Sequence, residues 1–421
     1  MTDGAASLTQ TAHGSKTPSR SPSPWLALAF ASLLVLSIPL GDSPPRWILL
    51  SAVTLAVATI LVARTRDADR WGTVAIWPVV VVAGTAILSI GLSELPGLAL
   101  ERSAPLAVYL LLVPIVQVLC WSPVAVRIFG GVAVLAILSI DLALLSDLIS
   151  KSGNDDVRWQ LNRVTGTFGN PNDLAVAAVL LPLASLVLPD RKRLGGTIVL
   201  ALAAAPSWAI SLSRQALLGW LVATVAMIRP SPRRRSTLAI VGGGIAFVTI
   251  LVLLNPMART RAIETLQGRD GGRSILYVYG VSLATDHPIT GIGPTLFGEY
   301  YVQDALDGWS WNDRPLQKVG MPWVHSLPLE VLVETGVVGV FAFGLVFVGA
   351  GRRLRSDPDR SHQARRLAWV ASGGLATLLV LGLVDLSFIK PWCHIVIWTT
   401  LGIAYAVPAR RPGPVNSPIE P

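Results

Sequence analysis

Runs of apolar residues separated by short polar stretches make up most of the chain. Most runs have about 16 to 23 residues, the length with which an α-helix crosses a ~30 Å hydrocarbon core at a rise of ~1.5 Å per residue. The pattern therefore predicts about twelve transmembrane helices. The predicted helices are 25–40, 47–63, 72–92, 104–121, 124–145, 174–188, 194–212, 215–228, 237–254, 331–350, 367–384 and 392–408.

The composition supports the same interpretation. The 421 residues are 52% hydrophobic and only 14% charged, whereas soluble domains carry roughly 25% charged residues. A typical soluble enzyme is therefore excluded. The expected fold class is an all-α polytopic membrane protein.

The two ends of the chain are expected to be polar tails on one transmembrane domain. Residues 1–24 are rich in Ser, Pro and Thr, which is typical of a disordered segment. The next apolar run has no small-residue cleavage site and is followed at once by another run, so we expect an uncleaved first helix. The transmembrane domain then covers 25–408, and a second tail covers 409–421.

The positive charge indicates how the chain crosses the membrane. The formal net charge is +9, but with a cytoplasmic N-terminus most of the 34 Lys and Arg residues fall in cytoplasmic loops, as the positive-inside rule expects. Both termini are therefore predicted to be cytoplasmic, in the inner membrane, with no nucleic-acid partner. Cys120 and Cys393 fall on opposite sides in this topology, so we expect no disulfide.

Two polar segments, 146–173 and 255–330, interrupt the helices and are predicted to be extracytoplasmic loops. A loop as long as 255–330 is uncommon unless it has its own structure or a function. Residues 274–286 place apolar side chains at helical spacing, which predicts a helix inside this loop. Pro288 and Gly291 then end the helix.

Several short motifs are weak. The glycines of GIGPTLFG (291–298) lack the spacing of a nucleotide-binding loop and do not follow a predicted strand. The Asp-x-Asp pairs at 67–69 and 357–359 lie between arginines on predicted cytoplasmic loops, where solvated charge is the simpler interpretation. We therefore predict no metal site.

Arg214 stands between two apolar runs, with almost no loop to keep it in water. A guanidinium in this position either reaches lipid head-group phosphates or binds an anionic ligand, because its planar fork matches phosphate oxygens. Both interpretations place Arg214 at the outer surface of the membrane.

His325 stands at the outer start of the tenth predicted helix. A histidine there is either structural or a base that works near neutral pH. The nearby Glu330 and Glu334 lie off its helical face, although Pro328 places the start of the helix close to this point. A carboxylate partner must therefore come from elsewhere, and Asp385 is the candidate.

Four stretches, taken in order, resemble the O-antigen ligase and polymerase family of bacterial envelope polysaccharide enzymes. Each stretch is short and rich in glycine, but their order, spacing and predicted outer location make the combination specific. They are RVTGTFGNPNDLA (163–175), SLSRQALLG (211–219), GRDGGR (268–273) followed by HPITGIG (287–293), and HSLPLEVLVETGVVG (325–339).

This resemblance implies a C-type glycosyltransferase architecture of about twelve helices, with a large, partly helical outer loop and an outward-facing site. Membrane lipids surround such an enzyme, and its donor is a glycan on undecaprenyl diphosphate. The acceptor is a hydroxyl of a glycolipid or an envelope polymer, and no nucleotide sugar, metal or cofactor is needed.

Carried over to this chain, the resemblance makes Arg214 and Arg273 the diphosphate-binding residues. His325 becomes the catalytic base or acceptor-positioning group, and Arg163 and Lys390 add further positive charge. The chain departs from the family's usual His-Asn pair, because Ser326 follows the histidine. A serine can still donate or accept one hydrogen bond. We therefore expect the change to alter how the acceptor is positioned and to leave the reaction class the same.

Two other functions stay open at this stage. A polymerase that joins lipid-linked repeat units shares the same motifs. A secondary transporter is less favoured, because we see no inverted repeat and few intramembrane carboxylates, of which Asp141 is the clearest.

Overall fold

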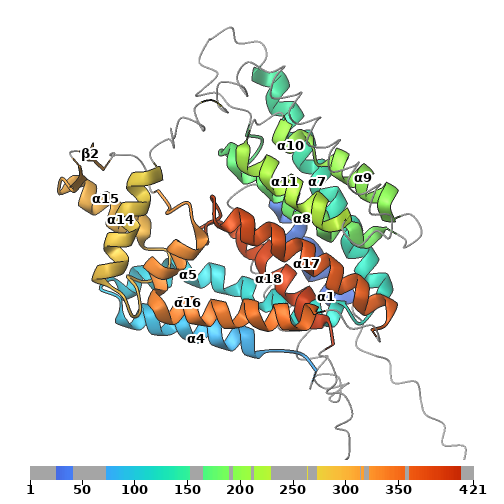
Figure 1. Ribbon diagram of the computed structural model, residues 1–421, viewed down its shortest axis with the longest axis horizontal. Helices are drawn as coiled ribbons and strands as arrows, with labels where there is room; N and C mark the ends of the chain where they lie inside the picture. The colour runs from blue at the N-terminus through green and yellow to red at the C-terminus, as the bar shows by residue number, and fades with distance from the viewer. Residues whose placement is uncertain are drawn as a thin grey trace, which may run out of the picture.

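The computed structural model describes residues 25–40, 73–151, 165–188, 193–209, 213–228, 263, 273–312, 314–316, 322–355 and 360–408. Apart from one small hairpin, its regular elements are helices (Figure 1). The predicted helices 47–63 and 237–254 and both predicted tails lie outside the described residues.

The elements follow one another from α1 to α18, with 3₁₀ helices labelled η. They are α1 (Trp25–Ser37), η1 (Ile38–Leu40), α4 (Trp77–Leu92), α5 (Pro96–Ala107), η2 (Val108–Leu111), α6 (Leu112–Leu119), α7 (Pro123–Lys151), η3 (Pro171–Ala175), α8 (Val176–Ala184), η4 (Ser185–Val187), α9 (Arg193–Ala203), α10 (Pro206–Ala209), α11 (Arg214–Ile228), α14 (Arg273–Asp286), α15 (Phe297–Leu306), β1 (Ser310–Trp311), β2 (Arg314–Pro315), α16 (Leu327–Leu354), α17 (His362–Gly382) and α18 (Pro391–Ala406).

Every predicted transmembrane run that falls within the described residues is largely helical. Four helical stretches are long and apolar enough to cross a bilayer, and shorter apolar helices accompany them. The protein is thus a multi-pass membrane protein whose described residues are mainly helical, while the number of twelve spans stays a prediction. The four stretches are Pro96–Leu119, Pro123–Ser150, Leu327–Leu354 and His362–Gly382.

Some boundaries differ from the predicted ones. Helix α7 continues to Lys151 and so enters the segment predicted as the smaller outer loop. The helix expected at 274–286 is confirmed as α14, and it ends at Asp286, before Pro288. The division into tails, loops and a domain from 25 to 408 stays a prediction. Both cysteines are buried and free.

Helix α17 lies at the centre of the bundle, against α8, α11, α16 and α18. In a bilayer the hydrophobic effect does not drive helices together, and small residues allow the close packing that holds them. In α18, a Cβ on Gly402 would lie 2.8 Å from the Cβ of Val116 in α6, so this contact requires glycine. Trp392 and Trp398 are among the large side chains buried in the resulting core.

Helix α16 is broken in its first third at Gly336, which has φ 62° and ψ −167°. The segment 288–293 runs beside the break and pairs with it. Ile292 and Gly293 donate backbone N–H groups to the carbonyls of Val333 and Glu334, at 3.0 Å each. Beyond the break, Val337 N–H donates to the Pro288 carbonyl at 2.9 Å. The broken helix therefore leaves its backbone groups paired, as an apolar environment requires.

The segment 288–293 is a turn that contains the first two glycines of the GIGPTLFG stretch. Gly291 has φ 68°, and a Cβ on it would lie 2.5 Å from the Thr335 nitrogen. Gly291 and Gly293 of the GIGPTLFG stretch thus lie in a turn packed on α16, whereas Gly298 lies in α15.

Helices α14 and α15 and the hairpin form a small unit beside the bundle, called here the loop subdomain (Figure 1). In the hairpin, Ser310 is paired with Pro315 in antiparallel register. The subdomain has its own aromatic core, in which Tyr279 contacts Phe297 and Trp309. Burial and a 2.7 Å hydrogen bond to Asp304 raise the pKa of Tyr279, so the hydroxyl stays protonated and donates.

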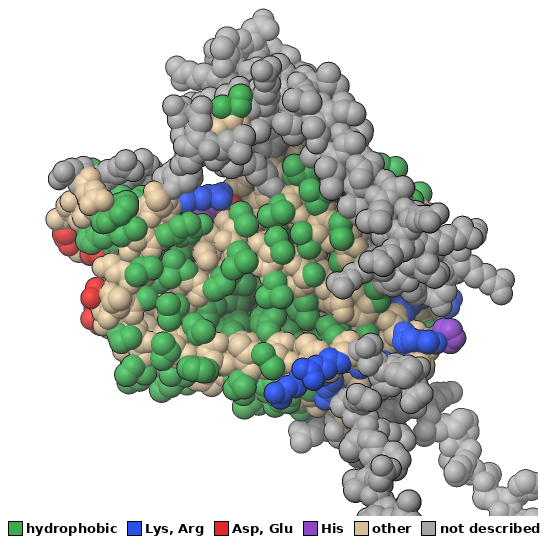
Figure 2. Space-filling view, in the orientation of Figure 1, with side chains coloured by type: hydrophobic (Ala, Val, Ile, Leu, Met, Phe, Trp, Pro, Cys, Tyr) green, Lys and Arg blue, Asp and Glu red, His purple; other side chains and the backbone are tan. Residues whose placement is uncertain are grey.

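The antiparallel helices α16 and α17 have the His325–Asp385 pair at one end and a group of arginines at the other. His325 precedes α16 and Asp385 follows α17, so these two residues share one end. Figure 2 shows Lys and Arg side chains over the opposite end of the pair, away from the loop subdomain. The described cations of the α16–α17 connection are Arg352, Arg353, Arg355, Arg360, Arg365 and Arg366.

Candidate active site

His325 and Asp385 meet at the end of the bundle that faces the loop subdomain. His325 Nδ1 is in hydrogen-bond contact with Asp385 Oδ1, so the partner suggested by the sequence is confirmed as a contact. His325 has φ 58°, in the left-handed region that few non-glycine residues adopt. The backbone just before α16 therefore has an uncommon conformation at the residue whose ring contacts Asp385.

Asp385 is the centre of the cluster. Its side chain is 1% exposed, and both oxygens accept hydrogen bonds from two groups each. Trp323 Nε1 donates to Oδ1 at 3.2 Å, beside His325. Asn172 and Arg273 donate to Oδ2 at 2.7 and 2.9 Å. A buried carboxylate needs such compensation, because an unpaired charge there costs several kcal/mol.

Arg273 is the first residue of α14 and brings the loop subdomain to the cluster. Besides Asp385, its guanidinium donates to the Val384 carbonyl at 3.3 Å. One turn later on α14, the Tyr277 hydroxyl donates to the His325 carbonyl at 3.3 Å. The Arg273 side chain is 23% exposed, and a guanidinium has five N–H donors, so donors remain for a ligand.

Lys390 lies in the same cluster but has a different partner from the one expected. Its ammonium contacts both carboxylate oxygens of Asp173 and lies 4.1 Å from the centroid of the Trp323 ring. Lys390 is 5% exposed. Its role in diphosphate binding stays a prediction, but its charge is already balanced by a buried carboxylate.

The two remaining predicted arginines are not seen as side chains. Arg163 lies outside the described residues, as does the side chain of Arg214, whose backbone begins α11. The residue before it, Ser213, donates its hydroxyl to Asn172 Oδ1 at 3.1 Å. The start of α11 is thereby linked through Asn172 to Asp385, so the Arg214 backbone begins the helix next to the cluster.

The two glutamates near His325 have other partners, as expected from their positions on the helix. Glu330 accepts from the Ser387 hydroxyl at 2.8 Å and the Phe388 N–H at 3.0 Å. Glu334 accepts the Thr295 N–H at 2.8 Å. Both carboxylates hold neighbouring segments against α16, and neither contacts His325 among the described residues.

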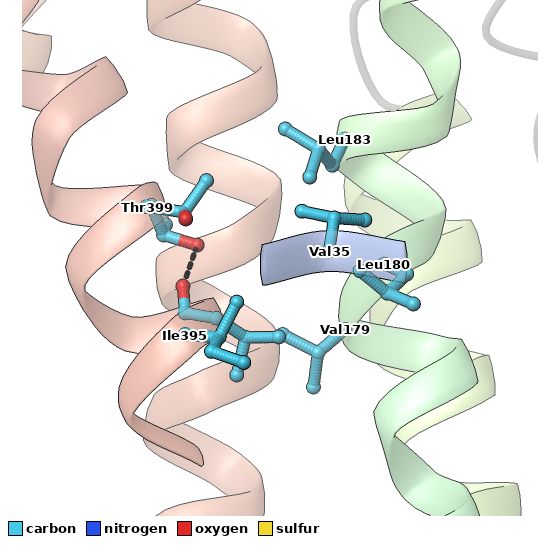
Figure 3. A pocket seen from close by; sticks show the side chains of 8 residues that line it. Val35, Val179, Leu180, Leu183, Ile395 and Thr399 are labelled. Atoms are coloured by element: carbon cyan, nitrogen blue, oxygen red, sulfur yellow. Dashed lines mark hydrogen bonds between the residues drawn. The ribbon is translucent and has the colours of Figure 1, made fainter. Parts of the chain in front are cut away.

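A small apolar pocket lies between α1, α8 and α18 (Figure 3). Helices α8 and α18 begin just after Asp173 and Lys390, so the pocket lies further along the two helices that start at the polar cluster. It is lined by Val35, Val179, Leu180, Leu183, Ile395, Val396, Thr399 and Thr400. The dashed line in Figure 3 marks a hydrogen bond within α18, in which the Thr400 hydroxyl donates to the Val396 carbonyl at 2.7 Å.

Sequence reasoning assigned no role to several residues of the cluster. Asn172 and Asp173 stand in the GNPND stretch, and Trp323 stands two residues before His325. A polar stretch directly before an apolar run was the available signal for the first two. Trp323 carried none, because an isolated tryptophan is common at membrane surfaces.

The central part of the chain is similar to known proteins. Residues 197–344 match the O-antigen ligase family, a segment that contains α11, α14 and His325. Over 202 residues the chain is 25% identical to the exopolysaccharide production protein ExoQ of Rhizobium meliloti (strain 1021). This alignment spans 44% of the chain and only 42% of that relative. The central segment of the chain is thus similar to the O-antigen ligase family, as the four sequence stretches indicated.

Proposed function

We propose that the protein is a membrane glycosyltransferase that moves a glycan from undecaprenyl diphosphate to a hydroxyl group of a glycolipid or cell-envelope polymer. The observation that carries the proposal is the pairing of His325 with a buried Asp385, beside the part-exposed Arg273. A base and a cation lie together at one end of the helices, next to the loop subdomain. The likeness of residues 197–344 to the O-antigen ligase family supports a role in polysaccharide synthesis.

The proposed chemistry uses the histidine as a base. With Nδ1 turned to Asp385, Nε2 is the nitrogen left to accept the proton of an acceptor hydroxyl. Such general base catalysis contributes typically about 10²–10⁴-fold. The carboxylate keeps the ring oriented and stabilises the imidazolium that forms, as in other His–Asp pairs.

The arginines serve the leaving group in this proposal. When the anomeric C–O bond breaks, negative charge develops on the diphosphate, and fixed cations in a partly dehydrated site stabilise it. Arg273 has donors available for this, and we propose that Arg214 and Arg163 add to it. Because arginine supplies the counter-charge, we propose that the reaction proceeds without metal.

The direct test uses the purified protein and lipid-linked glycans extracted from membranes of the source organism. Release of undecaprenyl diphosphate is measured in EDTA for the wild type, His325→Ala and Arg273→Ala. We expect EDTA-resistant turnover that falls at least about 10²-fold in the histidine variant. Equal turnover in all three proteins, with unchanged melting temperatures, would contradict the assignment.

A polymerase is the second candidate, and one observation favours it. The relative that the chain resembles is named for exopolysaccharide production, so the product here is proposed to be a polysaccharide if the likeness extends to function. The same assay separates the two. A ligase gives one discrete product per acceptor, whereas a polymerase gives a ladder that differs by one repeat unit.

We propose that the site faces the extracytoplasmic side of the inner membrane, with both termini in the cytoplasm. The cations at the opposite end of α16 and α17 support this orientation (Figure 2). Reporter fusions after Ala406 and within the predicted loop 255–330 test it. An enzymatic reporter that works only in the cytoplasm is expected to be active in the first fusion and inactive in the second.

A further inference from the structure

The surroundings of Lys390 differ from those of an anion-binding residue. Lys390 precedes α18, and Pro391 opens that helix, which sets the lysine backbone in an extended conformation. The side chain is 6% exposed. An ammonium has three N–H donors. The Lys390 ammonium contacts both carboxylate oxygens of Asp173, and the Trp323 ring covers another side of it.

A diphosphate could reach this ammonium only by displacing Asp173. The displaced carboxylate is 3% exposed and would lose its lysine counter-charge in a buried position, which is unfavourable. Arg273 differs, because its side chain is 23% exposed and its carboxylate partner Asp385 has three further hydrogen-bond donors.

Trp323 connects the two ion pairs. One ring face lies under the Lys390 ammonium, at 4.1 Å from the centroid. The indole centroid is 4.6 Å from the centroid of the His325 ring, and its N–H donates to Asp385 at 3.2 Å. A cation over an indole ring attracts its electrons and holds the ring in place. The tryptophan thus touches both members of the His–Asp pair.

We infer that Asp173, Lys390 and Trp323 form a positioning wall for His325 and Asp385, and that Lys390 is not a diphosphate ligand. This inference rests on the proposed transferase function. Lys390, neutralised by Asp173, fixes the indole ring. The indole ring in turn fixes the imidazole and one oxygen of Asp385. All three are positioning residues, because they act on the acceptor hydroxyl through His325.

The most informative variant is Asp173→Asn. If Lys390 were a ligand of the donor, removing the carboxylate charge would free the ammonium and tighten the binding of undecaprenyl diphosphate. If the wall positions His325, kcat falls about tenfold, while the donor KM and the inhibition constant of undecaprenyl diphosphate stay within about twofold. A misplacement of 1 Å is enough for losses of about 10²-fold.

A second variant removes the risk of misfolding from an unpaired buried lysine. Asp173→Asn combined with Lys390→Gln takes away both charges together, so the melting temperature is expected to stay closer to that of the wild type than in Asp173→Asn alone. Turnover is expected to stay about tenfold low, with an unchanged inhibition constant, because no cation holds the indole ring.

Trp323→Phe keeps an aromatic ring between the lysine and the histidine but removes the N–H donated to Asp385. We expect a three- to tenfold lower kcat with the donor KM unchanged. Trp309→Phe is the matched control, because Trp309 packs on Tyr279 in the loop subdomain, and its kcat is expected to equal that of the wild type.

The outcomes separate the two levels of the proposal. Suppose that turnover depends on His325, and that undecaprenyl diphosphate inhibits Asp173→Asn more tightly than the wild type but inhibits the double variant tenfold more weakly. This result would overturn the positioning wall and leave the transferase assignment intact. A wild type whose turnover does not need His325 would overturn the transferase assignment and this inference with it.

Discussion

Two groups of polar contacts lie within apolar surroundings, and they are built in different ways. Around Asp385, side chains from η3, α14, the segment before α16 and the end of α17 meet in one cluster. Around Gly336, the backbone of 288–293 pairs with the backbone of a broken helix. The first group is partly open, through Arg273 and His325, whereas the second is closed.

The Asp385 cluster is suited to chemistry, whereas the backbone pairing at Gly336 is suited to structural support. Side chains carry charge and protons, and two of them at the Asp385 cluster are part-exposed. The backbone pairs at Gly336 have no titratable group and hold the loop subdomain against α16. Damage to the first region should therefore appear in turnover, and damage to the second should appear in folding.

The largest expected effect is that of Asp385→Asn on turnover. The amide cannot orient the neutral histidine in the same tautomer or stabilise its protonated form, and such a change in a known His–Asp pair costs about 10⁴-fold. We expect kcat to fall at least about 10³-fold in the release assay, with the protein still eluting as a single species. A loss below tenfold would argue against the pairing.

Gly336→Ala should act on folding. A Cβ at this position would collide with the Ile289 carbonyl, and φ 62° is unfavourable for a residue with a side chain. We expect a loss of about 3 kcal/mol or more, measured as the yield of monodisperse protein and its melting temperature. Gly344→Ala, also in α16 but with open space around it, is the control and should behave like the wild type.

Tyr277→Phe tests the contact between the loop subdomain and the Asp385 cluster. The hydroxyl donates to the His325 carbonyl at 3.3 Å, and a neutral hydrogen bond contributes about 1 kcal/mol. We expect a fall in kcat of about fivefold or less, with at most a small decrease in melting temperature. An effect as large as that of Asp385→Asn would give the tyrosine a direct role that the geometry does not support.

Ser89→Ala should have the smallest effect. The hydroxyl lies 2.6 Å from the Thr290 carbonyl and 2.8 Å from the Glu334 carbonyl, but its one proton serves a single bond at a time. A decrease of about 1 kcal/mol in the free energy of unfolding is expected. The turnover of the folded protein should be that of the wild type, and a change in kcat would connect the α16 break to catalysis.

The helices were predictable because a membrane imposes local rules. A run of about 20 apolar residues forms a helix wherever it crosses the bilayer, since its backbone groups must pair within the run. The helix at 274–286 and the turn after it followed from local spacing and from Pro288 in the same way. The break at Gly336 did not, because the partner of the break is a segment more than 40 residues earlier.

The candidate site divides along the same line. His325 and the arginines could be selected as chemical groups from their types and their place beside apolar runs. The sequence alone does not reveal that Lys390 binds Asp173, at a separation of 217 positions, or that Asn172 binds Asp385, at a separation of 213. Such pairs depend on which helix ends meet. Helix packing decides which ends meet. Local composition determines that a helix forms, but it does not determine which helices pack against it.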